Sequence, residues 1–154
     1  METGGRPRTG DRRPETGDRR PKTGTAVPRL TFHPSKRLID HSLINYLALD
    51  YLAAVYELGS QLPRSESYNL KSQLERAATS IVLNIAEGST GQSDAEQNRF
   101  LGLALRSYVE TVACWDLIAK LRYLPGQELQ AIREQGHELF VKLQAFRKSL
   151  ARRG

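Results

Sequence analysis

The sequence lacks the features that define several large classes of protein. Cys114 is the only cysteine among its 154 residues, so no intramolecular disulfide can form. No apolar run approaches the ~20 residues that a membrane-spanning helix needs. The N-terminus has no apolar segment of the kind found in secretory signals. We therefore expect a cytoplasmic protein that makes no contact with a membrane.

The motifs of catalytic and metal sites are also missing. The three histidines are scattered, and none is placed at a metal-ligand spacing with another ligand. The two Glu-x-x-His motifs that a di-iron bundle needs are not present, nor is a glycine-rich phosphate loop or a nucleophile elbow. Cys114 lies among apolar residues with no histidine nearby in the sequence, which favours a buried apolar role over a nucleophile. We expect no enzymatic activity, no metal and no cofactor.

The first 35 residues differ in composition from the rest of the chain. Residues 9–15 and 16–22 repeat the unit Thr-Gly-Asp-Arg-Arg-Pro followed by one charged residue, and no apolar residue lies between Met1 and Ala26. A segment without apolar residues cannot form a core, so we predict a disordered tail over residues 1–35. Two interpretations stay open: an arginine-rich arm that binds RNA or DNA phosphates, and the translated product of a simple DNA repeat. The second is favoured.

The net charge of +6 is unevenly distributed. Residues 1–30 carry eight basic and four acidic side chains, so this segment supplies +4 and the rest of the chain only +2. The high isoelectric point is therefore largely a property of the tail. A body at +2 is weak evidence that a single copy binds nucleic acid.

Residues 36–154 have the apolar periodicity of helices joined by short connections. Pro63 ends a first helix, and Gly88, which suits the left-handed position after a helix, ends a second. The capping box Ser93–Glu96 begins a third helix, and Pro125 separates it from a fourth. No segment has the alternation of a strand. We predict an all-α fold, an antiparallel up-down-up-down four-helix bundle.

The second helix carries an apolar seam and, about one position round, a polar ridge. The seam consists of Leu70, Leu74, Ala77, Ile81 and Ile85. The ridge consists of Gln73, Arg76, Ser80, Asn84 and Glu87. We predict that the ridge joins a semi-buried structural polar network made of Arg76, Ser80, Asn84, Glu87, Arg99, Arg106, Ser107 and Glu110. Acid/base work by Glu87 and Glu110 is the less favoured alternative.

The first and third helices have more apolar residues than one bundle core can bury. Besides the stripe Ile44, Leu47, Tyr51, Val55, Leu58 and Leu62, the first helix has a second stripe of Ile39, Leu43, Tyr46 and Ala53. The third helix adds Phe100, Leu103, Ala104, Leu117 and Ile118 to its own seam. The fourth has one apolar stripe and a charged opposite face. Excess apolar surface predicts a partner, and self-association is the simplest assumption.

Two segments resemble a known family. Residues 74–88, Leu-Glu-Arg-Ala-Ala-Thr-Ser-Ile-Val-Leu-Asn-Ile-Ala-Glu-Gly, and residues 100–110 resemble the four-helix-bundle proteins encoded in intervening sequences of bacterial 23S ribosomal RNA. The resemblance covers about residues 38–150 and excludes the tail. It implies a homopentamer of four-helix bundles with no assigned enzymatic activity. The chain is similar also to the accessory variability determinant of diversity-generating retroelements, which implies binding to a reverse transcriptase and nucleic acid.

The resemblance leads to two hypotheses about function. The favoured one is a pentameric module that binds RNA or an RNA-processing partner, because five copies raise a body charge of +2 to +10. Its candidate contacts are Arg64, Lys71, Lys120, Arg122, Arg133, Lys142, Arg147, Lys148, Arg152 and Arg153. The other is an assembly scaffold that binds protein through its bundle faces. The accessory role in a retroelement is kept as a variant of the first.

Overall fold

The computed structural model describes Met1, residues 36–90 and residues 93–152. The predicted disordered tail, apart from Met1, and the candidate contact Arg153 lie outside the described residues.

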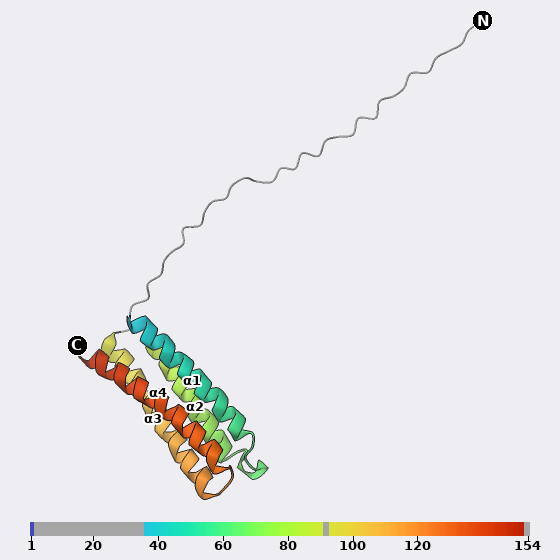
Figure 1. Cartoon of the computed structure of the whole chain (residues 1–154). Coiled ribbons are helices and arrows are strands. Elements are labelled where there is room, and N and C mark those ends of the chain that lie inside the picture. Colours follow the sequence, from blue (N-terminus) through green and yellow to red (C-terminus); the bar gives the residue numbers. More distant parts are fainter. Residues whose placement is uncertain (2–35, 91–92, 153–154) are drawn as a thin grey trace. The chain divides into compact units, whose positions relative to one another are not determined.

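Four long helices follow one another along the chain. They are α1 (Lys36–Gly59), α2 (Leu70–Gly88), α3 (Asp94–Lys120) and α4 (Gly126–Ala151), with a short 3-10 helix η1 (Arg64–Glu66) between α1 and α2. Each helix packs against the next, and α4 packs against α1, so the four enclose a single core (Figure 1). The described part of the chain contains no strand. This confirms the predicted up-down-up-down bundle.

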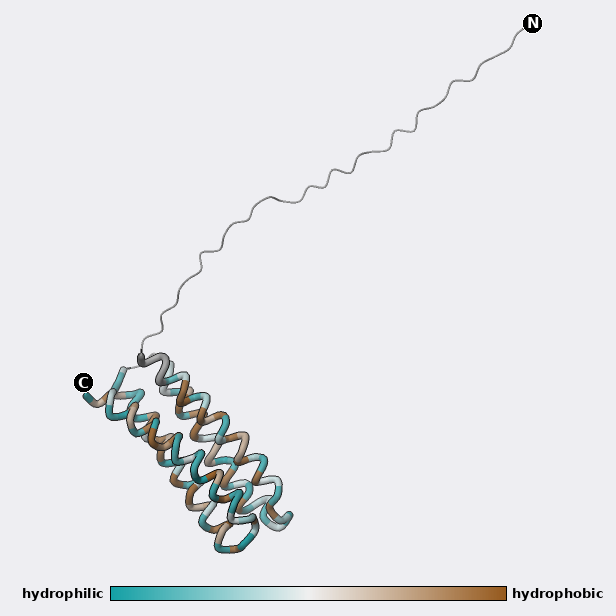
Figure 2. The backbone as a smooth tube through the Cα atoms, viewed as in Figure 1, coloured by the Kyte–Doolittle hydropathy of each residue, from teal (hydrophilic) through white to brown (hydrophobic). Residues whose placement is uncertain are grey.

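Each helix turns its predicted seam into the core. All five seam residues of α2 are buried, and so is the whole stripe of α4, which is Leu129, Ile132, Gly136, Leu139, Leu143, Phe146 and Leu150. Apolar and polar residues alternate along every helix in Figure 2, as a helix with one face in a core requires. Burial of each Leu or Ile in these seams stabilises the fold by about 1.5–3 kcal/mol.

A chain of buried hydrogen bonds crosses the core diagonally from α3 to α1. The indole Nε1 of Trp115 donates to Tyr51 Oη at 3.0 Å, and Thr111 Oγ1 donates to the carbonyl of Tyr108 at 2.6 Å. Tyr51 Oη and Thr111 Oγ1 lie 2.8 Å apart. Because the single hydroxyl proton of Thr111 is already given to a carbonyl, Tyr51 is the donor in this pair. Burial raises the pKa of Tyr51 to about 12.

The helix ends differ in detail from the sequence prediction. α1 ends at Gly59 and α3 at Lys120, each a few residues earlier than expected. The start of α3 is confirmed, because Ser93 Oγ accepts from the backbone N–H of Glu96 at 3.3 Å. At Arg122 the backbone adopts the left-handed conformation, with φ 58°.

The predicted left-handed conformation of Gly88 is wrong. Gly88 is the last residue of α2, and the following Ser89 is right-handed. A Cβ atom on Gly88 would lie 3.1 Å from Cβ of Phe100, which is tighter than an ordinary contact. The glycine therefore allows α2 to approach α3 closely, and it supplies no reversal of the chain.

Candidate functional site

Ser80 is the centre of the polar ridge on α2. Ser107 Oγ of α3 donates to Ser80 Oγ at 2.9 Å. One turn along α2, Asn84 Nδ2 donates to the Ser80 carbonyl at 2.8 Å and lies 3.1 Å from its Oγ. These three residues of the predicted network are thus brought together, and they join α2 to α3 through side chains.

Ser80 lines two hollows. The smaller, about 260 Å³, is lined by Arg76, Ala77, Ser80, Ser107 and Glu110. The larger, about 490 Å³, is lined by Arg76, Thr79, Ser80, Leu83, Asn84, Glu87 and Phe100. Glu87 and Glu110 therefore line different hollows, so the arrangement does not place them around one bound group.

The arginines of the predicted network lie at its edge. Arg76 donates to Gln73 on its own helix, and among the described residues it makes no ion pair with Glu110. Arg99 and Arg106 are exposed on α3, and the guanidinium of Arg99 lies 5.5 Å from the ring centroid of Phe100. The described part of the chain shows no hydrogen bond from either to the Ser80 cluster. The bonded network is smaller than the eight residues that the sequence indicates.

Cys114 is buried, as the sequence predicts for a small apolar residue. Burial raises the pKa of the Cys114 thiol, Glu110 raises it further, and Arg76 lowers it. The thiol is therefore protonated at neutral pH, and a protonated thiol is a poor nucleophile and a poor metal ligand. Within the described residues no three His, Cys, Asp or Glu side chains form a group that could hold a metal ion.

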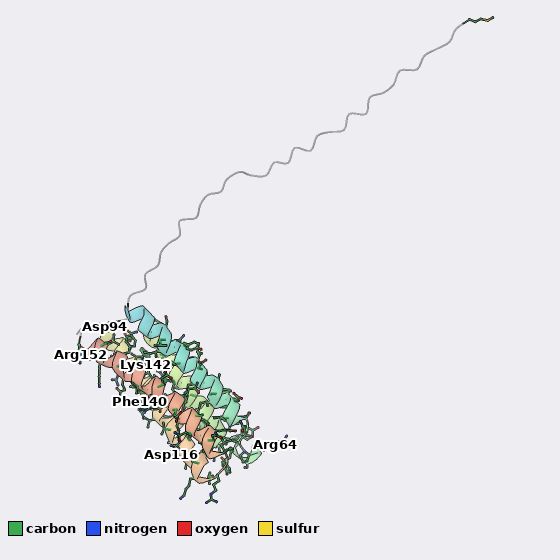
Figure 3. The ribbon with its side chains drawn as sticks, viewed as in Figure 1. Arg64, Asp94, Asp116, Phe140, Lys142 and Arg152 are labelled. Carbon is green, nitrogen blue, oxygen red and sulfur yellow. The ribbon has the colours of Figure 1, made fainter. Side chains whose placement is uncertain are left out.

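The candidate nucleic-acid contacts occupy two ends of the bundle. Arg64, Lys71, Lys120 and Arg122 lie at or beside the α1–α2 and α3–α4 connections, whereas Lys142, Arg147, Lys148 and Arg152 belong to the C-terminal half of α4 and the residue after it. Arg133 lies in the first half of α4. In Figure 3 the labels of Arg64 and Arg152 mark these opposite ends.

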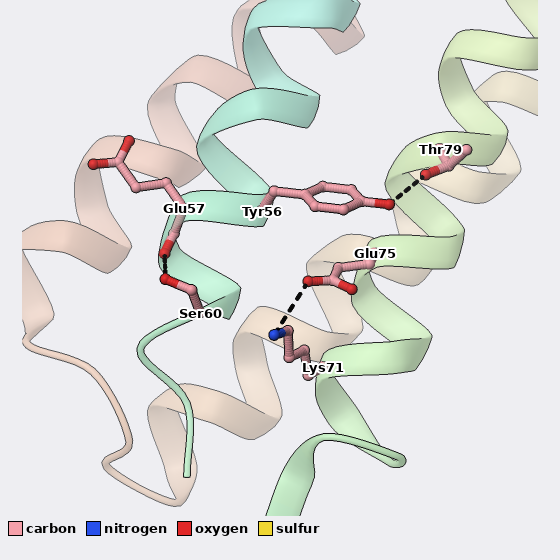
Figure 4. A network of polar contacts seen from close by, with 6 residues as sticks. All are labelled: Tyr56, Glu57, Ser60, Lys71, Glu75 and Thr79. Carbon is pink, nitrogen blue, oxygen red and sulfur yellow. Dashed lines mark hydrogen bonds and ion pairs between the residues drawn. The ribbon is translucent and has the colours of Figure 1, made fainter. Parts of the chain in front are cut away.

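Three of these basic residues have partners within the chain. Lys71 Nζ lies 3.8 Å from Glu75 Oε1, and a dashed line marks this ion pair in Figure 4. Arg133 pairs with Asp116 at 2.7 Å. Arg147 Nε donates to Asn98 Oδ1 at 2.7 Å. Six others make no ion pair with any residue that the structure describes: Arg64, Lys120, Arg122, Lys142, Lys148 and Arg152.

Large apolar side chains remain exposed on α1, α2 and α3. On α1 these are Leu43, Tyr46, Leu49 and Tyr56, on α2 Leu83, and on α3 Val109 and Leu117. Tyr56 also contacts α2, since its hydroxyl lies 3.3 Å from Thr79 Oγ1 (Figure 4). The only large apolar residue exposed on α4 is Val141, within the described residues. This confirms the surplus apolar surface of α1. Of the five residues that the sequence adds to the seam of α3, Leu117 is exposed, whereas Ala104 and Ile118 are fully buried in the core.

Fold and surface together define an all-α bundle with a polar cluster between α2 and α3 and partly apolar outer faces. The family of 23S rRNA-intervening sequence proteins matches residues 43–145, more than half of the chain, and the chain belongs to this family. No curated protein matches it. Among the described residues, no helix is long and apolar enough to cross a membrane.

A solved structure has a similar fold. It is the crystal structure of a protein with unknown function from the S23 ribosomal protein family of Bacteroides thetaiotaomicron. The two structures superpose with a TM-score of 0.66 at 23% sequence identity, and the match covers 71% of this chain and 98% of that one. At this identity the likeness concerns the fold.

The two connections at one end of the bundle touch each other, which the sequence patterns do not indicate. Tyr123 Oη, after α3, donates to Glu66 Oε1 of η1 at 3.0 Å. The sequence patterns give no role to Tyr68 either, and its side chain is 99% exposed. A signal for it was available, because Tyr68 is the one aromatic residue in the polar loop before α2.

Proposed function

We propose that this chain is a non-enzymatic homo-oligomer, a pentamer of four-helix bundles, that binds RNA or an RNA-processing partner. The observation that carries the proposal is the exposure of apolar side chains along α1. Tyr46 is 61% exposed and Leu49 is 47% exposed. Both lie on helix α1 outside the core, and neither has a hydrogen bond that would explain its position among the described residues.

Association would remove these side chains from water. Apolar surface gains about 25 cal/mol for each Å² that is buried, and exposed patches of this kind are typical of contact sites between proteins. The charged outer face of α4, with Glu134, Glu138 and Lys142 exposed, is suited to remain in water. The asymmetry between α1 and α4 supports packing of copies through α1 and α3.

Basic side chains without acidic partners support the RNA-binding part of the proposal. Six of the ten candidate contacts make no ion pair in the described part of the chain. One copy offers a weak field, but an assembly repeats each basic group several times on one particle. Binding to phosphates then releases many counterions, so it is strong at low salt and weak at high salt.

A protein-binding scaffold is the second candidate. It is favoured by Leu83, which is 63% exposed at the edge of the larger hollow between α2 and α3. An apolar surface with polar residues at its rim is a common feature of protein contact surfaces.

A titration of single-stranded RNA at two salt concentrations separates the two. It uses the full chain and a shortened chain that begins at residue 36, with circular dichroism to check that both are helical. The proposal predicts that both bind, and that affinity falls by at least about tenfold between about 50 mM and 200 mM salt. Affinity that disappears with the tail would overturn RNA binding by the bundle and leave the scaffold.

A further inference from the structure

Glu66 links the α1–α2 connection to the α3–α4 connection through hydrogen bonds. Its Oε1 accepts from Tyr123 Oη at 3.0 Å, and its Oε2 accepts from Asn69 Nδ2 at 2.9 Å and from the backbone N–H of Leu70 at 3.4 Å. The hydrogen bond with Glu66 also raises the pKa of Tyr123. The loop before α2 and the turn before α4 therefore lie side by side, at the same end in Figure 1. We call the surface formed by Arg64, Tyr68, Lys120 and Arg122 the loop end.

The side chain of Tyr68 does not help to stabilise the described part of the chain. Its side chain is 99% exposed, and no hydrogen bond or ring contact holds it. The other exposed tyrosines, Tyr46 and Tyr56, lie on the side of α1, where the proposed association would cover them. An aromatic ring that is free on both faces can stack on a nucleobase.

Three basic side chains of the loop end are available to bind phosphate. Glu75 and Asp116 form ion pairs with Lys71 and Arg133, and the carboxylate of Glu66 is held by the neutral groups of Tyr123 and Asn69. Two more, Glu57 and Glu128, line a separate hollow of about 310 Å³ between α1 and α4. Arg64, Lys120 and Arg122 are exposed, and among the described residues they have no acidic partner.

Arg122 occupies a backbone position that glycine would fill at lower cost. Its φ of 58° lies in the left-handed region, and its N–H bonds the carbonyl of Ala119 while that of Tyr123 bonds the carbonyl of Ile118. This is the Schellman ending of a helix, where glycine is the usual residue. The backbone at this position favours glycine, so the fold alone does not explain the presence of an arginine side chain.

We infer that the loop end binds unpaired RNA, with a base stacked on Tyr68 and the adjoining phosphates paired with Arg64, Lys120 and Arg122. We expect a single strand rather than a duplex, because the bases of a duplex are stacked on one another and offer no free face to Tyr68. The inference rests on the proposed function and adds to it the site and the kind of strand. Copies that associate through α1 and α3 would leave the loop ends open, one for each copy.

The stacking contact is tested by changing Tyr68 in the full chain. The probe is a short fluorescein-labelled RNA of mixed sequence, used as a single strand and as a duplex with its complement, and anisotropy gives the affinity. Tyr68→Ala is expected to weaken single-strand binding about tenfold, and Tyr68→Phe to keep it within about twofold. Duplex binding stays within about twofold for both. Unchanged single-strand affinity of Tyr68→Ala, or an equal loss for the duplex, would overturn the inference.

The phosphate contacts are tested with two variants that each remove two positive charges. One carries Arg64→Gln and Arg122→Asn, because asparagine tolerates the left-handed conformation, and the matched control carries Lys142→Gln and Lys148→Gln at the other end. The loop-end variant is expected to lower the slope of log affinity against log salt by about 1.4, at about 0.7 for each phosphate that is no longer neutralised. The control removes two candidate contacts outside the loop end, and it is expected to lower the slope by clearly less than the loop-end variant does.

The outcomes separate the inference from the proposed function. If the unmodified chain binds no RNA at low salt, RNA binding by this protein and the loop-end site are both wrong. If it binds and the two double variants lower the slope equally, binding is diffuse over the surface and only the loop-end site is wrong.

Discussion

Gly136 of α4 lies directly against the ring of Tyr51 of α1. A Cβ atom on Gly136 would lie 2.9 Å from Cε2 of Tyr51 and equally close to Cε2 of Tyr108. Atoms do not approach to this distance without displacement, and both rings are buried. The glycine therefore lets α4 come close to the two tyrosines that fill the middle of the core.

Gly136→Ala is expected to destabilise the bundle. The substitution gains about 1 kcal/mol of helix propensity, but displacement of the rings by the added methyl group costs about 1–3 kcal/mol, so the net loss is up to about 2 kcal/mol. Gly126→Ala is the control, because nothing lies within 4 Å of the Cβ it adds. Urea denaturation at one fixed protein concentration measures both, since the stability of an oligomer depends on concentration. Equal stability of the two variants would show that the close approach is relieved without cost.

Thr111→Val is expected to cost about 1–3 kcal/mol of unfolding free energy. The substitution keeps the shape of the side chain but removes the acceptor for Tyr51, whose hydroxyl proton then has no partner in a dry core. Thr111 is fully buried. In the control Thr79→Val, the bond that is removed, to Tyr56, is exposed, and the expected change is within about 0.5 kcal/mol. A loss no larger at Thr111 than at Thr79 would contradict the account of the buried chain.

The buried Tyr51 predicts a loss of stability in alkali. Its pKa is about 12 in the fold against 10.0 for an unperturbed tyrosine, so between these values the unfolded chain releases a proton that the folded chain keeps. The contribution is therefore complete below pH 10 and is lost as the pH rises toward 12, by at most about 1.4 kcal/mol per pH unit. The Tyr51→Phe variant should have a lower free energy of unfolding at pH 7, and above pH 10 its free energy of unfolding should change less with pH than that of the unmodified chain. Parallel curves of unfolding free energy against pH for the two proteins, measured by urea denaturation, would refute this explanation.

Arg122→Gly is expected to raise the free energy of unfolding by about 1 kcal/mol. Glycine adopts the left-handed conformation without a clash of Cβ with the backbone, which an arginine at φ 58° must bear. Arg122→Ala keeps the Cβ and is expected to change stability little. A glycine variant no more stable than the alanine variant would mean that the backbone at this position is unstrained.

The periodicity of the sequence was enough to predict which helix faces form the core. All seven stripe residues of α4 and all five of α2 are buried, because a 3.6-residue repeat of apolar side chains can be satisfied only by one buried face. The second stripe of α1 was recognised in the same way, and its members Leu43 and Tyr46 are exposed as surplus to the core.

The apolar periodicity does not predict which side chains of different helices contact each other. Periodicity places Tyr51 in an apolar stripe and gives no indication that its hydroxyl group meets Thr111 and the indole of Trp115 across the bundle. The polar network was predicted too wide for a related reason. Spacing along α3 does not show which side chains face α2, and in the structure Arg99 and Arg106 are exposed rather than turned toward the ridge. The role of Gly88 was ambiguous in the sequence for a similar reason. Glycine is favoured both where two helices approach closely and where the backbone is left-handed, and only the structure shows that the first applies.

Leu49 and Val141 offer a matched comparison for self-association. Each is 47% exposed, but Leu49 lies on the apolar side of α1 and Val141 on the charged face of α4. Leu49→Glu is expected to dissociate the assembly, because it places a charge in an apolar contact. Val141→Glu should leave it intact. Dissociation by both, or by neither, would show that α1 is not the contact face.

The molar mass of the unmodified full chain tests the central claim most directly. Light scattering at micromolar concentration is expected to give a single species with a mass close to five times the 17.3 kDa of one copy. A single species of 17.3 kDa at that concentration would contradict the account, because the apolar side chains on α1 and α3 would then be stable in water without a partner.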